Sequence, residues 1–387
     1  MENPKIRFKG YTKDWEQRKL GELGTVQTCK RIFKDQTSEK GDIPFFKNGT
    51  IGLEPDSYIS REMYEEFRRL YPYPEVGDTL ISVVGSIGRT AEYTGKDEYF
   101  QDSNVVWLKT DGSINKKFLK ISYQVIKWLI EGSTVKHLYN DNILRSEIVM
   151  PVSQIEQAKI AEFFEELDHL ITLHQRKCEQ TKKLKKYMLQ KMFPQNGAKV
   201  PEIRFDGFTY DWEQRKLSEL LEKYEDPVET PHDGYERVGI RSHAKGTFHS
   251  FVEPGKELDT AKMYRVAADK FILNITFAWE HAVAITDNND AGKLVSHRFP
   301  QFSFNPKLKP HFFKYLMLDK KFREHLELSS PGGAGRNRVL KISDMLKYEI
   351  KLPSIEEQIK IGEYFDSLDH LITLHQRQHK LHLNMLL

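Results

Sequence analysis

The sequence carries the same ten residues twice, Leu-Asp-His-Leu-Ile-Thr-Leu-His-Gln-Arg, at positions 167–176 and 368–377. The identity extends outward from both copies. Aligning residues 156–176 with 357–377, an offset of 201, gives 16 identities in 21 positions. A repeat of this length, spaced by about half of the 387-residue chain, predicts two structural halves that each end in the same element.

The repeated element is predicted to be a long helix. Apolar residues recur every three or four positions, and no Pro or Gly occurs between positions 152 and 193. About forty helical residues would span roughly 60 Å. A single apolar stripe of that length needs a partner, and the second copy is the obvious one, although two unconnected surface helices are the alternative. The positions expected at the coiled-coil or subunit interface are Ile160, Phe163, Leu167, Leu170, His174, Ile361, Tyr364, Leu368, Leu371 and His375.

A second repeat marks the start of each half. Residues 4–23 and 201–220 share 15 of 20 positions at an offset of 197. Each half therefore consists of a near-constant opening, a divergent middle and a near-constant helix. Constant segments that enclose a different middle in each half indicate one scaffold that performs the same kind of recognition on two different targets.

The divergent middles are predicted to be mixed α/β. Strands are expected at 43–46, 79–84, 105–108 and 147–150 in the first half, with helices at 61–70 and 116–130. In the second half we expect strands at 271–277, 283–286 and 348–352 and a helix at 312–328.

Composition narrows the class of protein. The chain is 39% hydrophobic and 12% aromatic, which suits folded domains, and its length predicts two or three of them. The net charge of +3 does not by itself indicate a nucleic-acid partner. Two cysteines in unrelated contexts, Cys29 and Cys178, form no disulfide framework or metal pattern, which fits a cytoplasmic protein. No apolar run reaches eighteen residues, so no membrane span is expected.

The short connection between the halves predicts the architecture. The second helix leaves the second domain close to where the first helix ended, so the compact arrangement is antiparallel. We expect two mixed α/β domains at opposite ends of an antiparallel two-helix coiled-coil stem, related by a pseudo-two-fold internal repeat, a symmetry that duplex DNA shares locally. The predicted segments are a first domain at 1–151, a helix at 152–193, a linker at 194–200, a second domain at 201–353 and a helix at 354–387.

The most specific motifs are the R-F-x-G-[FY]-T-x-D-W-E-Q-R-K-L openings and the E-Q-x-K-I-x-E-[FY]-F helix starts that follow Pro151 and Pro353. With these motifs the whole chain resembles the specificity (S) subunit of type I restriction–modification systems. The resemblance implies two target recognition domains, each reading one half of a bipartite, asymmetric site in double-stranded DNA. It also implies that the helices dock two modification subunits, which bind S-adenosylmethionine and methylate adenine. Restriction subunits that use ATP and Mg²⁺ would join that core, leaving no cofactor in this chain. One departure is that the second helix is a turn or two shorter than the first.

No catalytic pattern accompanies the resemblance, so the chain is predicted not to be an enzyme. There is no G-x-x-x-x-G-K-[ST] loop, and neither Asn-Pro pair continues into the Pro-aromatic motif of an adenine methylase. His169 and His174 differ by about 140° around a helix and cannot share a metal. We expect His174 at the helix seam and His169 on its flank.

Candidate DNA contacts are the loops that combine forked donors, amides and small residues. In the first domain they are Lys47, Asn48, Gly85, Ser86, Arg89, Ser133, Thr134, Lys136 and His137. In the second they are Gly333, Arg336, Asn337 and Arg338, with Arg241, His243, Lys245 and Trp279 as weaker candidates. For most of them a solvated surface loop is the competing interpretation. The competing function is a coiled-coil scaffold whose globular domains bind other proteins.

Overall fold

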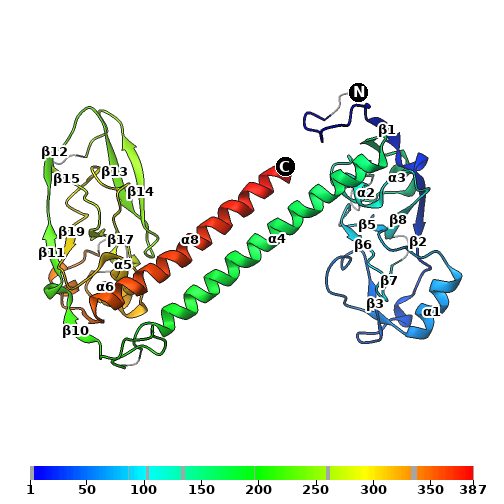
Figure 1. Cartoon of the computed structure of the whole chain (residues 1–387). Coiled ribbons are helices and arrows are strands. Elements are labelled where there is room, and N and C mark those ends of the chain that lie inside the picture. The colour runs from blue at the N-terminus through cyan, green and yellow to red at the C-terminus, as the bar shows by residue number, and fades with distance from the viewer. Residues whose placement is uncertain are drawn as a thin grey trace. The chain divides into compact units, whose positions relative to one another are not determined.

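The computed structural model describes residues 4–386 except 86, 102–103, 132–135, 196, 259–261 and 333–337. The chain divides into two compact units (Figure 1). The first unit is Met1–Ile171 with His382–Leu387, and the second is Thr172–Leu381. The boundary therefore falls inside the first long helix. Each unit combines helices with several sheets, as the mixed α/β prediction requires.

The described residues of the first unit form three small sheets with the strand orders β1-β9, β2-β8-β5-β6 and β4-β3-β7. Its strands are β1 (Glu16–Lys19), β2 (Gly24–Thr28), β3 (Ile43–Phe46), β4 (Tyr58–Ile59), β5 (Thr79–Ser82), β6 (Thr90–Glu92), β7 (Tyr99–Phe100), β8 (Val105–Thr110) and β9 (Glu147–Met150). Its helices are α1 (Arg61–Leu70), α2 (Lys116–Ser122), α3 (Asn140–Arg145) and the first half of α4 (Gln154–Lys191).

The second unit has the strand orders β10-β20, β11-β19-β16-β17 and β12-β15-β18-β13-β14. Its strands are β10 (Glu213–Lys216), β11 (Leu221–Tyr224), β12 (Pro227–Glu229), β13 (Tyr235–Ile240), β14 (Thr247–Val252), β15 (Lys262–Arg265), β16 (Phe271–Leu273), β17 (Val283–Ile285), β18 (Leu294–Val295), β19 (Gln301–Phe304) and β20 (Glu349–Leu352). Its helices are α5 (Pro310–Leu316), α6 (Lys320–Leu328), α7 (Ile342–Met345), the second half of α4 and most of α8 (Ile355–Leu386).

The two units share one topology despite their divergent middles. The order β2-β8-β5-β6 corresponds strand for strand to β11-β19-β16-β17. In each unit a parallel pair, β3 with β7 or β13 with β18, is flanked by an antiparallel neighbour, β4 or β14. The β1-β9 ribbon pairs Glu16 with Met150, and β10-β20 pairs Glu213 with Leu352 in the same register. Each ribbon joins the constant opening to the strand before a long helix.

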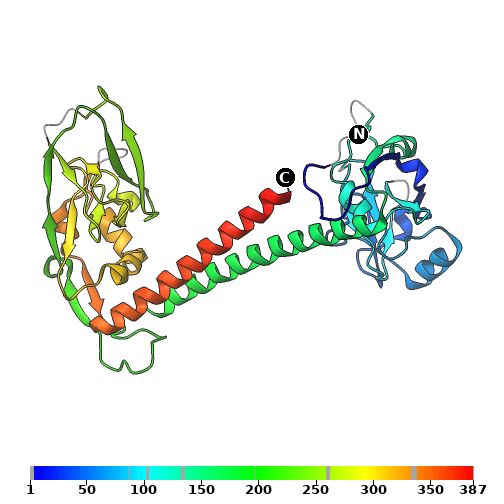
Figure 2. The same cartoon turned by 45° about the horizontal axis from the view of Figure 1, so that its top comes forward.

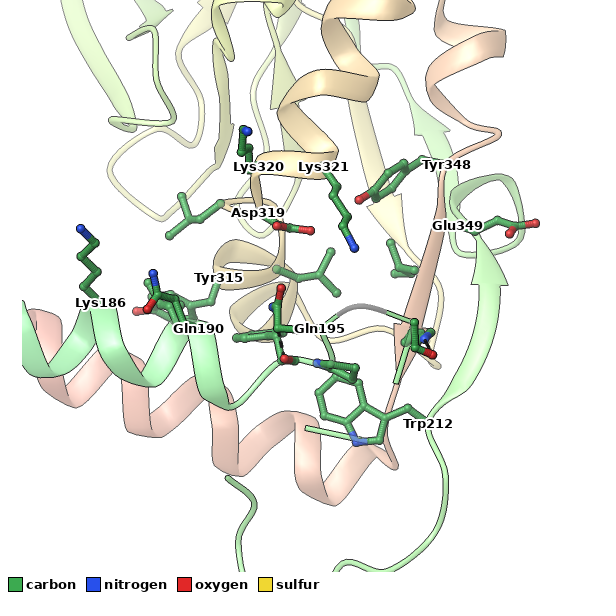
Figure 3. A pocket seen from close by; sticks show the side chains of 18 residues that line it. Lys186, Gln190, Gln195, Trp212, Tyr315, Asp319, Lys320, Lys321, Tyr348 and Glu349 are labelled. Carbon is green, nitrogen blue, oxygen red and sulfur yellow. Dashed lines mark hydrogen bonds between the residues drawn. The ribbon is translucent and has the colours of Figure 1, made fainter. Parts of the chain in front are cut away.

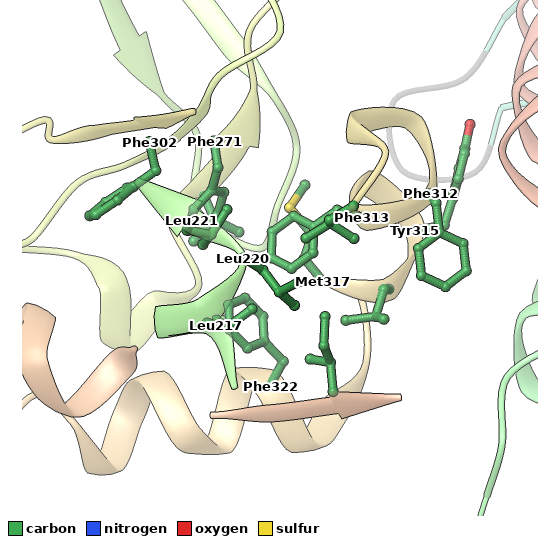
Figure 4. Close-up of a cluster of buried hydrophobic side chains, with 14 of the residues drawn as sticks. Leu217, Leu220, Leu221, Phe271, Phe302, Phe312, Phe313, Tyr315, Met317 and Phe322 are labelled. Carbon is green, nitrogen blue, oxygen red and sulfur yellow. The ribbon is translucent and has the colours of Figure 1, made fainter. Parts of the chain in front are cut away.

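The largest buried side chains in the core of the second unit are aromatic (Figure 4). The rings of Phe271 and Phe313 meet edge to face at 5.1 Å between centroids, and Phe313 meets Phe322 at 6.0 Å. These three side chains are fully buried. Aromatic burial of this size and geometry is a large contribution to stability. The first unit has two smaller clusters, one beneath α2 and the start of α4 and one around β3, β7 and α1.

A buried ion pair joins the two repeated segments in each unit. Arg7 of the first opening donates through Nε to Glu156 Oε1 at 2.6 Å and through Nη2 to Oε2 at 2.8 Å. Arg204 makes the same two-pronged contact with Glu357, with both distances 2.7 Å. Both glutamate side chains are at most 2% exposed. Because the opening segment and the helix start contact each other, the two segments are repeated together in each half.

A buried glutamine adds a second link at each helix start. The side chain of Gln157 accepts from Asn115 N and donates to Pro151 O, both at 2.8 Å. Gln358 accepts from Lys309 N at 2.9 Å and donates to Pro353 O at 3.1 Å. Asn115 and Lys309 precede α2 and α5, so the constant glutamine positions a helix of the divergent middle.

Within the second unit the end of α4 runs antiparallel to α8, and Figures 1 and 2 show the two helices side by side. His174 and His375 meet across this pair with their Nδ1 atoms 3.2 Å apart. Lys185 Nζ donates to Asp369 Oδ1 at 2.5 Å. His174 thus lies at the helix seam as predicted, and His169 is exposed.

Two predicted helices were too long. The helix expected over 116–130 ends at Ser122, because Trp128 turns back to pack against Tyr123 at 5.6 Å. The helix expected over 312–328 is broken into α5 and α6, because Asp319 adopts an extended conformation before α6. The strand expected over 271–277 ends at Leu273 and continues as a turn.

Replacing Arg204 with Ala would leave the carboxylate of Glu357 buried without its cation. We expect the second unit to lose about 3–5 kcal/mol of unfolding free energy, as for other broken buried pairs. Urea denaturation followed by tryptophan fluorescence, to which Trp212 and Trp279 of the second unit contribute, would measure this loss. The matched control is Arg215→Ala, which removes an exposed pair with Glu213 and should leave the transition in place. Equal effects of the two variants would contradict the role given to the buried pair.

Glu156 makes part of this stability depend on pH. The hydrogen bond from the Arg7 guanidinium holds the pKa of the Glu156 carboxyl below its ordinary value. Its contribution is therefore present above the ordinary glutamate pKa and is lost as pH falls through the lowered one. We expect Glu156→Gln to reduce the pH dependence of unfolding between about pH 5 and pH 3, where glutamates titrate. Acid titration by circular dichroism would test this, and an unchanged slope would contradict it.

Candidate nucleic-acid interface

Three loops of the first unit converge at the ends of its central strands. The side chain of Asn48, just after β3, donates from Nδ2 to Val84 O at 2.9 Å. Arg89, just before β6, donates from Nη1 to Gly49 O at 2.8 Å. His137 forms an isolated bridge with Val84. The described parts of the three loops predicted separately from the sequence thus form one cluster, which we call the first loop cluster (residues 47–50, 83–85, 87–89 and 136–138).

Glycines allow the middle loop of this cluster to turn tightly. Gly85 and Gly88 both have positive φ, 69° and 79°, a region that costs other residues free energy. Gly88 N donates to Ser82 O and Ser82 N to Arg89 O, so the loop closes on the end of β5. The turn places Gly85 at the surface, where its backbone is accessible to a ligand.

The basic residues of the first cluster differ in their contacts and in their exposure to solvent. Lys47 Nζ lies 3.0 Å from Asp56 Oδ1, and this contact lowers the pKa of the Asp56 carboxyl. Lys136 is exposed. The ring of His137 stacks on Tyr139 at 5.5 Å. The cluster therefore presents cations, an amide and stacked rings within one region, a mixture suited to phosphates and base edges.

The second unit has an equivalent cluster built from the equivalent loops. Residues 241–246 follow β13 as 47–50 follow β3, and residues 274–282 join β16 to β17 as 83–89 join β5 to β6. Ser242 Oγ donates to Glu280 Oε2 at 2.6 Å, and His243 N donates to Glu280 O at 2.9 Å. The guanidinium of Arg338 lies over the ring of Trp279 at 5.5 Å. We call these residues, with 338–340, the second loop cluster.

Backbone strain is concentrated in the second loop cluster. Four described non-glycine residues have positive φ, and three of them, His243, Ala244 and His281, lie here. Such conformations cost free energy and are frequent at functional sites. Ala244 N donates to His281 O at 2.8 Å, so the strained segments support each other. Burial lowers the pKa of His281, whose Nε2 lies 2.9 Å from Met317 O and donates to it in the neutral ring.

Most of the predicted contact residues lie in these clusters. Arg241 is exposed, with its guanidinium 5.3 Å from the ring of Phe248 and a hydrogen bond to Thr247 O, and Lys245 is exposed on the same turn. The predicted residues Ser86, Ser133, Thr134, Gly333, Arg336 and Asn337 lie outside the described residues.

Sequence reasoning missed several residues that hold the clusters together. Gln101 accepts from Asn48 N at 3.3 Å, and Val84 and Glu280 supply the oxygens that tie the loops. It also ranked the 241–245 and 279–281 segments as weak, although they are the topological equivalents of the first unit's loops. The repeated strand order would have identified them, but it is not readable from divergent sequences.

The predicted interface residues of the long helices are divided between the domain cores and the helix seam. Ile160 packs against the core of the first unit, and Ile361, Tyr364 and Leu368 belong to or pack against that of the second. His174 and His375 meet at the seam. The rest are Leu167, which is buried, Leu170, which is half-buried, and Phe163 and Leu371, which are about 40% exposed.

The described residues contain no group of three or more His, Cys, Asp or Glu side chains placed to hold a metal ion. Nor do they include a helix with the length and hydropathy needed to cross a bilayer. The chain thus contains two domains of one topology, each with a loop cluster rich in hydrogen-bond donors and each followed by a long helix, which is the layout of a protein built from two copies of one structural module.

Comparison with known proteins gives the family. The profile of the type I restriction modification DNA specificity domain matches residues 12–183 and again residues 210–384. The chain therefore belongs to this family, whose members are the DNA-recognition rather than the catalytic components of their complexes.

Individual relatives agree with the family assignment. A putative type I restriction enzyme specificity subunit from Haemophilus influenzae is 46% identical over 157 residues, which are 40% of this chain and only 41% of that protein. The putative MjaX specificity subunit from Methanocaldococcus jannaschii is 25% identical over 406 aligned positions, covering 94% of this chain and 89% of the relative. The crystal structure of a type I restriction-modification system S subunit from M. genitalium has the same fold, with a TM-score of 0.57 at 13% identity over 100% of this chain and 97% of that one.

Gly85→Ala should disturb the first loop cluster through backbone strain. The substitution forces an L-residue into positive φ, at a cost of about 1–2 kcal/mol, and places Cβ 3.5 Å from Asn48 Nδ2. We expect thermal unfolding of the first unit to shift down accordingly. Gly49→Ala is the matched control, because nothing lies within 4 Å of its added Cβ and its φ is not positive. A Gly85→Ala variant as stable as the control would show that the loop can rearrange freely.

Proposed function

We propose that this chain is the specificity subunit of a type I restriction–modification complex and that each loop cluster reads one half of a bipartite, asymmetric site in double-stranded DNA. The supporting observation is that equivalent loops on the same strand order carry different side chains. The first cluster offers Lys47, Asn48 and Arg89, and the second offers Trp279 and Arg338. A constant scaffold with variable donors is what reading two different half-sites requires.

The long helices would serve the assembly of the complex. We propose that their pairing sets the spacing between the two half-sites and that their exposed faces dock two modification subunits. Phe163, Leu184, Leu371 and Leu374 are apolar helix residues that are 38–45% exposed, a surface that a partner could cover. The cofactors would bind to the partner subunits: S-adenosylmethionine to the modification subunits, and ATP with Mg²⁺ to the restriction subunits. The complex would act on chromosomal DNA in the cytoplasm.

Exchange of one divergent middle at a time tests this function. Replacing residues 24–150 with those of another specificity subunit should change only one half of the methylated motif, measured by mapping N6-methyladenine in cells that carry the cognate modification gene. Replacing residues 221–353 is the matched control and should change only the other half. If either exchange altered both halves, the assignment of one half-site to each unit would be wrong.

The competing function, a scaffold whose domains bind proteins, predicts a different result. It predicts no methylation motif that depends on this chain and no affinity of the assembled complex for duplex DNA. A reader that neutralises phosphates shows an affinity that falls steeply with salt concentration. Weak binding that is insensitive to salt would therefore favour the scaffold.

A further inference from the structure

A segment rich in cations follows β2 in the first unit, outside the first loop cluster. Residues 29–34, which we call the basic segment, read Cys-Lys-Arg-Ile-Phe-Lys and contain no carboxylate. Cys29 and Ile32 are buried, at 3% and 7% exposure, and they anchor the segment in the core around β3 and β7. The three cations are exposed to solvent: Lys30, Arg31 and Lys34. With Asp35, which follows, the net charge is +2, from three cations and one carboxylate.

The strand order places the basic segment beside the first loop cluster. Thr28 ends β2 opposite Val106 of β8. Ser82 ends β5 opposite Val105 of the same strand. β2 and β5 therefore end at one edge of the sheet, on either side of β8, and two interstrand spacings put these ends about 10 Å apart. The basic segment leaves the sheet at one of them, and the loop that begins with Val83 leaves at the other.

Contacts with neighbouring rings order the start of the basic segment. The Tyr99 hydroxyl donates to Lys30 O at 3.1 Å, and Lys30 Nζ lies over the ring of Tyr71 at 4.9 Å. Neither Lys30 nor Lys34 forms an ion pair with a carboxylate in the part of the chain that the structure describes. Exposed ammonium groups that no carboxylate neutralises are suited to bind phosphate.

The equivalent position of the second unit carries neutralised carboxylates instead. β11 takes the place of β2 in the strand order, and Glu225 and Asp226 follow it. Glu225 Oε1 lies 2.6 Å from Lys223 Nζ. Asp226 Oδ2 lies 3.8 Å from Arg265 Nη1. Two units of one topology thus differ in charge at this edge, so the fold itself does not require the cations of the first unit.

A pocket of the second unit is also lined by lysines, but it lies elsewhere. It has a volume of about 500 Å³ and contains three lysines from α4 and α6 (Figure 3): Lys186, Lys320 and Lys321. Asp319 and Glu349 line the same pocket, so its charge is mixed. Its described lining includes no residue of the second loop cluster. These lysines therefore do not take the place of the basic segment.

We propose that the basic segment binds the DNA backbone next to the bases that the first loop cluster reads, with Lys30 and Lys34 donating to phosphate oxygens. This inference rests on the proposed function and adds to it a contact that carries no sequence information. The first unit thereby gains a salt-dependent contribution to affinity that the second unit does not make at the equivalent position.

The affinity of the assembled complex, with its modification subunits, for a duplex that carries its methylated site is measured over a series of salt concentrations. Each phosphate contact contributes about −0.9 to the slope of log K against log salt concentration. The double variant Lys30→Ala/Lys34→Ala should therefore make the slope shallower by about 2. Mapping of N6-methyladenine should show the same motif, because phosphate contacts do not select bases.

The matched control is Lys96→Ala/Lys109→Ala, which removes two exposed lysines from the opposite edge of the same sheet. It should leave the slope unchanged. If the Lys30→Ala/Lys34→Ala complex kept the full slope, the basic segment would not touch phosphate, although the proposed function would stand. A changed motif would also contradict the proposal, because it would show that these lysines read bases. An unchanged complex whose affinity did not respond to salt would instead refute the proposed function.

Acetylation of lysines by an amine-reactive ester, quantified by mass spectrometry, tests the unchanged complex without any variant. Lys30 and Lys34 should react more slowly when the duplex is bound, whereas Lys96 and Lys109 should react at the same rate with and without it. Equal rates at Lys30 and Lys34 would overturn the proposal. Protection of both lysines in the complex before DNA is added would overturn it as well, because a protein subunit would then cover the basic segment.

Discussion

The two buried Arg–Glu pairs are the contacts on which the rest of the structure depends. Each joins the first residues of a half to the first turn of its long helix, across 149 residues for Arg7 and Glu156 and 153 for Arg204 and Glu357. Everything between them in sequence must fold within that closed frame. A two-pronged guanidinium–carboxylate contact fixes orientation as well as distance, which a single lysine contact would not. The direction in which each helix leaves its domain is therefore set by the repeated residues.

The closed frame explains how the middles can differ. The ribbon strands β1 and β9 and their equivalents β10 and β20 pair in the same register, and the buried glutamines position α2 and α5. The central strands then follow one order in both units, although the second unit adds β12 and β15 to the side sheet. Because the loops leave the strand ends at equivalent places, their side chains can vary without changing where they act.

The sequence predicted the parts of the structure that depend on local pattern or on repetition. The long helices, the strands β3 and β9, the helix α1 and the antiparallel pairing followed from periodicity and from the short connection between the halves. The hairpin β13–β14 was not predicted, because Gly239 and the polar residues of β14 weaken a strand pattern that tertiary packing restores. The contacts of Asn48 with Val84 and of His243 with Glu280 could not be predicted from the sequence either, since such contacts depend on the strand order.

His174 and His375 lie at the position of the helix pair where a residue meets its own repeat equivalent. The offset of 201 that aligns the two helices maps His174 onto His375, and these residues face each other at 3.2 Å. A residue that meets its own equivalent must be complementary to itself. Two lysines or two glutamates would repel there, and two leucines would leave no polar contact to set the register. A neutral imidazole can donate from one Nδ1 while its partner accepts at the other, so identical residues form a hydrogen bond.

Neighbouring positions need not obey this condition, because they meet different residues: Cys178 faces the carbonyl of Ile372, and Lys185 pairs with Asp369. The self-contact at His174 therefore fixes the register of the pair, and the hetero-contacts that follow it along α4 fix its antiparallel direction.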